Sequence, residues 1–88
     1  MKSNKLEQLP NIGKTLAEKL EQAEITTPEQ LTAIGSENAF VKLSIIDDSA
    51  CYNMLCALEG AIQGIRWHSL SAEKKLELKE FFEMNKRS

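Results

Sequence analysis

The chain has 88 residues and a mass of 9.9 kDa, which suits one compact domain and is too short for a two-domain enzyme. Hydrophobic residues make up 42% and charged residues 27%, as in a folded domain rather than a disordered chain. The formal net charge of -2 argues against a strongly basic nucleic-acid-binding protein. Residues 24–50 hold one Lys against five Asp and Glu. We therefore expect any anion-binding surface near the N-terminus or in the last third.

The sequence predicts no membrane span and no metal site. No apolar run approaches the roughly 18 to 20 residues that a membrane helix needs, so we expect a soluble, cytoplasmic protein. Cys51 and Cys56 fall in one predicted helix, about 140° apart around its axis, where they cannot form a disulfide with each other. His68 is the only histidine and no Cys-x-x-Cys motif occurs. We expect two buried, reduced thiols, no metal and no cofactor.

Apolar residues recur at helical spacing almost throughout, which predicts an all-α domain. A short first element ends at Pro10, because proline cannot continue the preceding turn. Asn11 and Gly13 enter the left-handed region easily and predict a tight turn, with Ile12 pointing inward. A helix then restarts near Lys14 and ends near Glu24.

Two helices are predicted in the middle of the chain. A capping box at Thr27, with proline at the next position, begins a helix over residues 28–34 that Gly35 ends. Ser36 begins a further helix that ends before Asp47.

The longest predicted helix runs from about Ser49 to Gly64 and has a wide apolar stripe, which marks it as the central helix. Gly60 and Gly64 stand four residues apart, a spacing that lets a neighbouring backbone come close. Tyr52, beside the stripe, is expected at the surface.

A loop over residues 65–70 leads to the last predicted helix, which Ser71 caps. This helix is amphipathic, and its core-facing residues are expected to be Leu76, Leu78, Phe81 and Phe82.

The stretch from Leu9 to Leu20 resembles a helix-hairpin-helix motif, with Ala17 as the small residue four positions after Gly13. In that motif, backbone N–H groups of the hairpin and of the following helix face a DNA phosphate. The candidate phosphate-binding residues are Asn11, Ile12, Gly13, Lys14 and Thr15. Asn11 replaces the motif's first glycine, and its side chain can obstruct a phosphate. The alternative is a hairpin used only for packing, which the net charge of -2 favours.

Further stretches resemble the C-terminal domain of the TfoX/Sxy competence-regulator family. They are Leu-Thr-Ala-Ile-Gly-Ser-Glu-Asn-Ala-Phe at residues 31–40 and Leu-Glu-Gly-Ala-Ile-Gln-Gly-Ile-Arg-Trp-His at residues 58–68. The likeness covers about residues 5–82, so we expect one domain over residues 1–88 with its core in that range. The family's N-terminal domain has no counterpart here, so the chain resembles a free-standing C-terminal domain, a form found among bacterial proteins of unassigned function.

Arg66, Trp67 and His68 fit the family pattern, but the resemblance assigns them no binding role. Two hypotheses remain for these residues. They can complete the end of the long helix, with the cation on its terminal carbonyls and the indole over the core edge. Alternatively, they form an exposed patch that binds a partner.

The sequence as a whole predicts a small all-α domain of about five helices that begins with the helix-hairpin-helix-like unit and is not an enzyme. No P-loop, nucleophile elbow or paired-carboxylate motif occurs. The resemblance implies an interaction module for an unknown protein partner, related to competence or transcription. The alternative is weak, sequence-independent DNA binding through the hairpin. A homodimer is expected if the long helix leaves apolar surface exposed.

Overall fold

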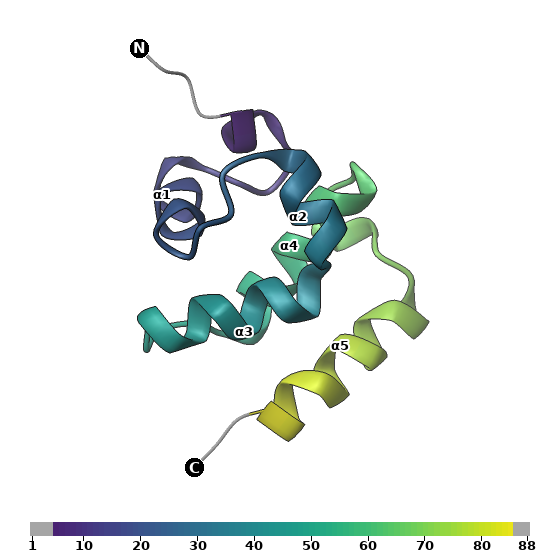
Figure 1. The fold of residues 1–88 in the computed structure, drawn as a ribbon. Helices are drawn as coiled ribbons and strands as arrows, with labels where there is room; N and C mark the ends of the chain where they lie inside the picture. The colour runs from purple at the N-terminus through teal and green to yellow at the C-terminus, as the bar shows by residue number, and fades with distance from the viewer. Residues whose placement is uncertain (1–4, 86–88) are drawn as a thin grey trace.

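The computed structural model describes residues 5–85 of the chain. They form five α-helices and two short 3-10 helices, joined by turns and short loops (Figure 1). No strand occurs among these residues, so the predicted all-α class and five helices are confirmed. Residues 1–4 and 86–88 of the predicted domain lie outside the described part. In chain order the elements are η1 (Lys5–Gln8), α1 (Lys14–Gln22), α2 (Pro28–Ile34), α3 (Ser36–Ile46), α4 (Tyr52–Gln63), η2 (Trp67–Ser69) and α5 (Ala72–Asn85).

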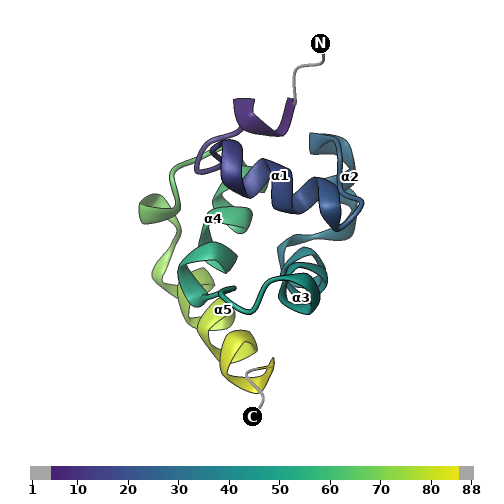
Figure 2. The ribbon, with the colours of Figure 1, turned by 90° about the vertical axis from the view of Figure 1, so that its left-hand side faces the viewer.

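Helix α4 lies at the centre of the fold, in contact with α2, α3, α5 and η2 (Figures 1 and 2). Leu55, Cys56 and Leu58 on this helix are completely buried. Burying a leucine side chain contributes about 1.5–3 kcal/mol. The wide apolar stripe of α4 is thus covered by its neighbours, as a central helix requires. Between residues 5 and 85, no helix has the length and apolar content that a membrane crossing would need.

The predicted N-cap at Thr27 is confirmed, but the reciprocal bond of the capping box is shifted by one residue, from Thr27 to Thr26. The Thr27 hydroxyl accepts a hydrogen bond from the Gln30 backbone N–H at 3.1 Å, and the Gln30 side chain accepts one from the Thr26 N–H at 2.7 Å. Gly35 ends α2 with φ +86° and directly precedes α3. This left-handed φ favours glycine and lets two helices follow each other without a loop.

The start of α4 differs from the prediction. Ser49 does not cap the helix, because its backbone N–H and hydroxyl both donate to the Asp47 carboxylate, at 3.0 and 2.6 Å. The Ser49 N–H closes an Asx turn, and the Ala50 N–H donates to the Asp47 carbonyl at 3.1 Å, so α4 begins only at Tyr52. Helix α5, with 14 residues, is therefore longer than α4, with 12.

The later helix start also corrects the expectation for the two cysteines. Cys51 precedes α4 as its N-cap and is exposed, whereas Cys56 is buried as expected. Both thiols are free. Burial raises the pKa of the Cys56 thiol.

Helix α5 packs through one side of its last turns. Leu78 is buried, and the Phe82 ring meets Phe40 of α3 edge to face, with 5.9 Å between centroids. Leu76, predicted in the core, is 57% exposed, because it stands about 200° around the helix from the buried Leu78. The Tyr52 hydroxyl, expected at the surface, donates to the Lys75 carbonyl at 3.1 Å and ties α4 to α5.

Candidate functional site

The hairpin turn has one left-handed residue, Asn11, with φ +71°. Gly13 has φ -95° and ψ -173°, an extended conformation, so the expectation that it also turns left-handed is wrong. Ile12 between them is 5% exposed and joins the core as predicted. Gly13 is the N-cap of α1, and in the described part of the chain it has no side-chain capping hydrogen bond and no atom within 4 Å of the place a Cβ would take. Lys14 and Thr15 are exposed.

The Asn11 side chain points into the molecule and joins the hairpin to the segment after α4. Its amide nitrogen donates to the carbonyls of Ile65 at 2.9 Å and Ala57 at 3.4 Å. Its amide oxygen accepts from the Trp67 backbone N–H at 3.1 Å. We call these three hydrogen bonds the Asn11 bridge. The expected obstruction of the hairpin's outer face by this side chain is therefore absent.

Gly60 leaves the space that the Asn11 bridge occupies. A Cβ at this position would lie 2.5 Å from the Asn11 amide nitrogen and 2.8 Å from the Ile65 carbonyl oxygen. The close approach predicted for the glycine pair is thus a property of Gly60. Gly64 has a different role, because it ends α4 in the left-handed conformation with φ +78°.

Arg66, Trp67 and His68 form the surface next to the Asn11 bridge. Trp67 is half-buried against the core, and the exposed His68 ring stacks on it, with 4.0 Å between centroids and 29° between planes. Arg66 is exposed, and its side chain makes no hydrogen bond or ion pair within residues 5–85. It therefore does not cap the α4 carbonyls. The carbonyl of Ile65 is instead held by Asn11.

The structure thus brings together the two sets of residues that the sequence singled out. The amide group of Asn11 holds the backbone of both Ile65 and Trp67, on either side of Arg66. The Lys75 ammonium group donates to the His68 carbonyl at 3.2 Å and holds the far end of the segment. The Arg66–His68 patch is therefore presented on a backbone fixed at several points.

A groove of about 440 Å³ lies beside the N-terminus of α1, between the hairpin and the start of α4. Two lysines line it, but Lys19 is held by Asp47 at 2.6 Å. This hydrogen bond, followed by those from Ser49, lowers the pKa of Asp47 to about 2. Lys14, the other lysine of the groove, forms no ion pair with any of residues 5–85. The groove is lined by Gly13, Lys14, Thr15, Leu16, Lys19, Asn53 and Met54.

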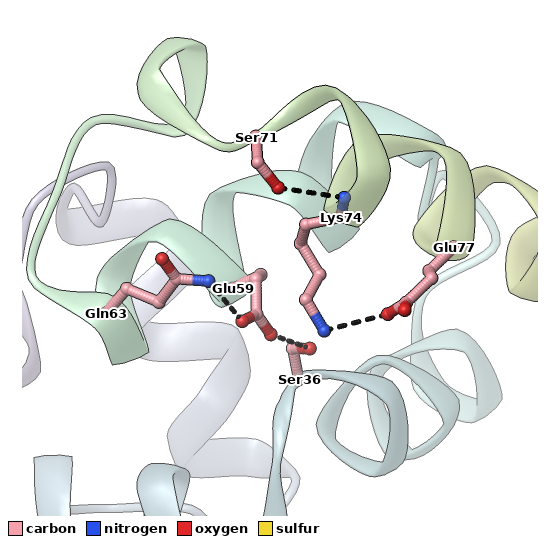
Figure 3. Close-up of polar contacts among 6 residues, drawn as sticks. All are labelled: Ser36, Glu59, Gln63, Ser71, Lys74 and Glu77. Atoms are coloured by element: carbon pink, nitrogen blue, oxygen red, sulfur yellow. Dashed lines mark hydrogen bonds and ion pairs between the residues drawn. The ribbon is translucent and has the colours of Figure 1, made fainter.

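A polar cluster that the sequence did not predict lies where α3, α4 and α5 meet (Figure 3). The Ser36 hydroxyl, on a residue only 5% exposed, donates to the Glu59 carboxylate at 2.6 Å, and the Gln63 amide donates to the same carboxylate at 2.7 Å. Lys74 reaches toward the cluster and pairs with Glu77 at 3.0 Å (Figure 3). The Glu77 hydrogen bond, with the nearby Glu59 and Glu37 charges, raises the pKa of Lys74.

This cluster borders a cleft of about 320 Å³, but its polar groups already bind one another. The Ser36–Glu59 hydrogen bond links α3 to α4, whereas Lys74 and Glu77 pair within α5. The residues of the cluster lie up to 41 positions apart, from Ser36 to Glu77, so no local motif predicts it. No group of three or more His, Cys, Asp or Glu residues in the described part could hold a metal ion.

Comparison with known proteins places this geometry in a family. The model of the TfoX C-terminal domain matches residues 2–82, nearly the whole chain. The chain belongs to the TfoX C-terminal domain family. The predicted resemblance is thereby confirmed. A search of curated proteins found no match.

Two solved structures from Listeria monocytogenes share this TfoX C-terminal domain fold. One, described as an uncharacterized protein, is 51% identical, with 90% of each chain covered and a TM-score of 0.88. The other, described as a protein of unknown function, is 49% identical and has a TM-score of 0.90, with 92% of this chain and 99% of that chain covered. These likenesses establish fold and family and name no ligand.

Proposed function

We propose that this TfoX C-terminal domain is a non-enzymatic, cytoplasmic interaction module that contacts a regulatory protein through the Arg66–His68 patch. The observation that supports the proposal most strongly is the exposed Arg66 guanidinium, which has no partner of its own within residues 5–85, beside the stacked rings of Trp67 and His68. Arginine and aromatic side chains are enriched among residues that dominate binding energy. The role is related to competence or transcription, as in the family's regulators.

The chemistry of the patch favours a partner surface with carboxylates and apolar atoms together. Arg66 can bind a carboxylate through two parallel hydrogen bonds. The half-buried indole of Trp67 and the exposed ring of His68 offer a flat apolar surface next to it. Because the Asn11 bridge fixes the backbone beforehand, binding needs to order few groups.

The proposal is tested by capture from lysate of cells that encode the chain, with quantitative mass spectrometry. The wild type is compared with the double variant Arg66→Ala/His68→Ala and with a control, Lys79→Ala/Glu80→Ala, on the exposed side of α5. We expect at least one protein retained by wild type and control but depleted with the patch variant. Equal retention by all three would contradict the proposal.

A second candidate function is weak, sequence-independent DNA binding through residues 11–15. It is supported by the uncapped N-terminus of α1, the open space at Gly13 and Lys14, which has no ion pair among residues 5–85. Such a contact is electrostatic, so binding should weaken steeply as salt rises. Fluorescence anisotropy of labelled duplex DNA tests it at two salt concentrations, with Lys14→Glu alongside. A DNA affinity that changes neither with salt nor in the Lys14→Glu variant would contradict the hairpin contact.

A further inference from the structure

His68 is the only histidine of the chain and Trp67 the only tryptophan, and their rings stack on each other. The two ring centroids lie 4.0 Å apart, with 29° between the planes. His68 is exposed, whereas Trp67 is half-buried and packs against the core. Histidine is the side chain whose charge ordinarily changes between about pH 5 and pH 8. The one residue type of the Arg66–His68 patch that can change its charge near neutral pH therefore lies directly on the aromatic surface of the patch.

The His68 imidazole has both ring nitrogens available to a ligand. Within residues 5–85 it forms no hydrogen bond and no ion pair, and the bond from the Lys75 ammonium group goes to the His68 backbone carbonyl. A neutral imidazole offers one donor and one acceptor, whereas the protonated ring offers two donors and a positive charge. A proton would thus make His68 a second cation beside Arg66 without breaking a hydrogen bond of the described part.

The charged groups nearest to His68 along the chain and on α5 are cations. Arg66 stands two positions before it, and the Lys75 ammonium group lies 3.2 Å from its carbonyl oxygen. These like charges oppose protonation of the imidazole, whereas the face of the Trp67 indole attracts a cation. A carboxylate placed on the patch would favour the protonated ring, because it attracts the imidazolium and the guanidinium together.

No carboxylate among residues 5–85 binds His68. Helix α4, which packs against η2, has Glu59 as its only charged residue, and neutral groups already donate to that carboxylate. The other titratable groups of α4 are Tyr52 and the buried Cys56. On α5, Glu73 is exposed in the first turn and forms no ion pair within the same range. The hairpin over residues 9–13 carries no charge. The anion that would pair with a protonated His68 must therefore come from a ligand.

We propose that protonation of His68 raises the affinity of the Arg66–His68 patch for acidic peptides, so that the domain binds them more tightly in mildly acidic solution. The inference rests on the proposed function, because it concerns the regulation of the same patch. The neutral patch offers one cation and the protonated patch offers two. An additional ion pair at an exposed site strengthens binding by up to about fivefold. Because the coupling is reciprocal, the bound peptide also makes His68 easier to protonate.

Trp67 fluorescence tests the protonation of the stacked ring without any ligand. A protonated imidazole in contact with an indole quenches its emission, because the cation accepts an electron from the excited ring. We expect the emission of the wild type to fall between about pH 8 and about pH 5.5, and that of His68→Gln to stay constant. Circular dichroism at both pH values confirms that both proteins are folded. Emission that falls equally in both proteins, or in neither, would overturn the proposal.

Fluorescence anisotropy measures the binding itself, with a labelled, tryptophan-free peptide of alternating Asp and Phe residues as the probe. Its aspartates stay ionised above about pH 5, and the ionic strength is kept constant. The wild type should bind it about fivefold more tightly at about pH 5.5 than at about pH 8, whereas His68→Gln should show no such change. A wild-type affinity equal at both pH values, a change that His68→Gln retains, or no binding at either pH would overturn the proposal.

The same titration separates this proposal from the proposed function. The variant Arg66→Ala/His68→Ala should bind the probe more weakly than the wild type at both pH values. Binding that this variant loses, but that does not depend on pH in the wild type, would remove the role of His68 protonation and leave the patch as a binding site. Binding by the wild type and this variant that is equal at each pH would contradict both proposals.

Discussion

Replacement of Asn11 by glycine tests the Asn11 bridge most sharply, because glycine is the better residue for the backbone alone. At φ +71° the change removes the cost of a left-handed L-residue, a gain of about 0.5–1 kcal/mol. It also removes three hydrogen bonds, of which the one to Ala57 is long at 3.4 Å. At about 0.5–1.5 kcal/mol for each bond, with a further cost for unpaired buried groups, the loss is about 3 kcal/mol. We expect a net destabilisation of about 2 kcal/mol.

For a domain of this size, that loss lowers the melting temperature by about 8–16 °C. Thermal unfolding followed by circular dichroism and by fluorescence gives two readouts, and Trp67, which the bridge holds, is the only tryptophan. Asn11→Asp should be at least as damaging, because it sets an oxygen against the carbonyls of Ile65 and Ala57. An Asn11→Gly variant as stable as the wild type would show that the Asn11 bridge does not stabilise the fold.

Four further changes test other parts of the fold. Gly60→Ala should lower the melting temperature despite alanine's higher helix propensity, because its Cβ would lie 2.5 Å from the Asn11 amide nitrogen. Glu24→Gly should raise it by about 4–8 °C, since Glu24 follows α1 with φ +69° and glycine relieves about 1 kcal/mol there. The pKa of Asp47 is lowered from 3.8 to about 2, so the stability this carboxylate contributes is present above pH 3.8 and lost as the pH falls to about 2. Melting curves of Asp47→Asn should therefore depend less on pH in that range, and an unchanged dependence would contradict the Lys19 pairing. Burial raises the pKa of Tyr52 from 10.0 to about 12, so its contribution is complete below pH 10.0 and lost as the pH rises to about 12. Tyr52→Phe should lose about 1 kcal/mol at neutral pH, measured by urea unfolding, and should flatten the alkaline dependence.

Sequence reasoning found the helices because their ends are encoded locally. The N-cap at Thr27 and the turn at Asn11 each depend on residues within a few positions, and both are present in the structure. The prediction was wrong at the start of α4. Ser49 is a residue type typical of an N-cap, but its N–H and hydroxyl donate to the Asp47 carboxylate instead. Two hydrogen-bonding patterns compete at such a site, and composition alone does not decide between them.

The sequence predicted the residues of the candidate site but not that they lie together. The sequence identified residues 11–15 and 66–68 separately, each from a local pattern. The two segments lie side by side because Asn11 forms hydrogen bonds with Ala57, Ile65 and Trp67, which are 46 to 56 positions away in the sequence. The exposure of Ile45 was equally hidden, because helical periodicity shows which residues are apolar and not which sides are covered.

The central claim is that the Arg66–His68 patch binds a protein. The most direct test is titration of the purified captured protein, followed by calorimetry, against the wild type, Arg66→Ala/His68→Ala and Lys79→Ala/Glu80→Ala. We expect the patch variant to bind at least about tenfold more weakly and the control to bind as the wild type does. Equal affinity for all three would contradict the claim and place the contact elsewhere on the domain.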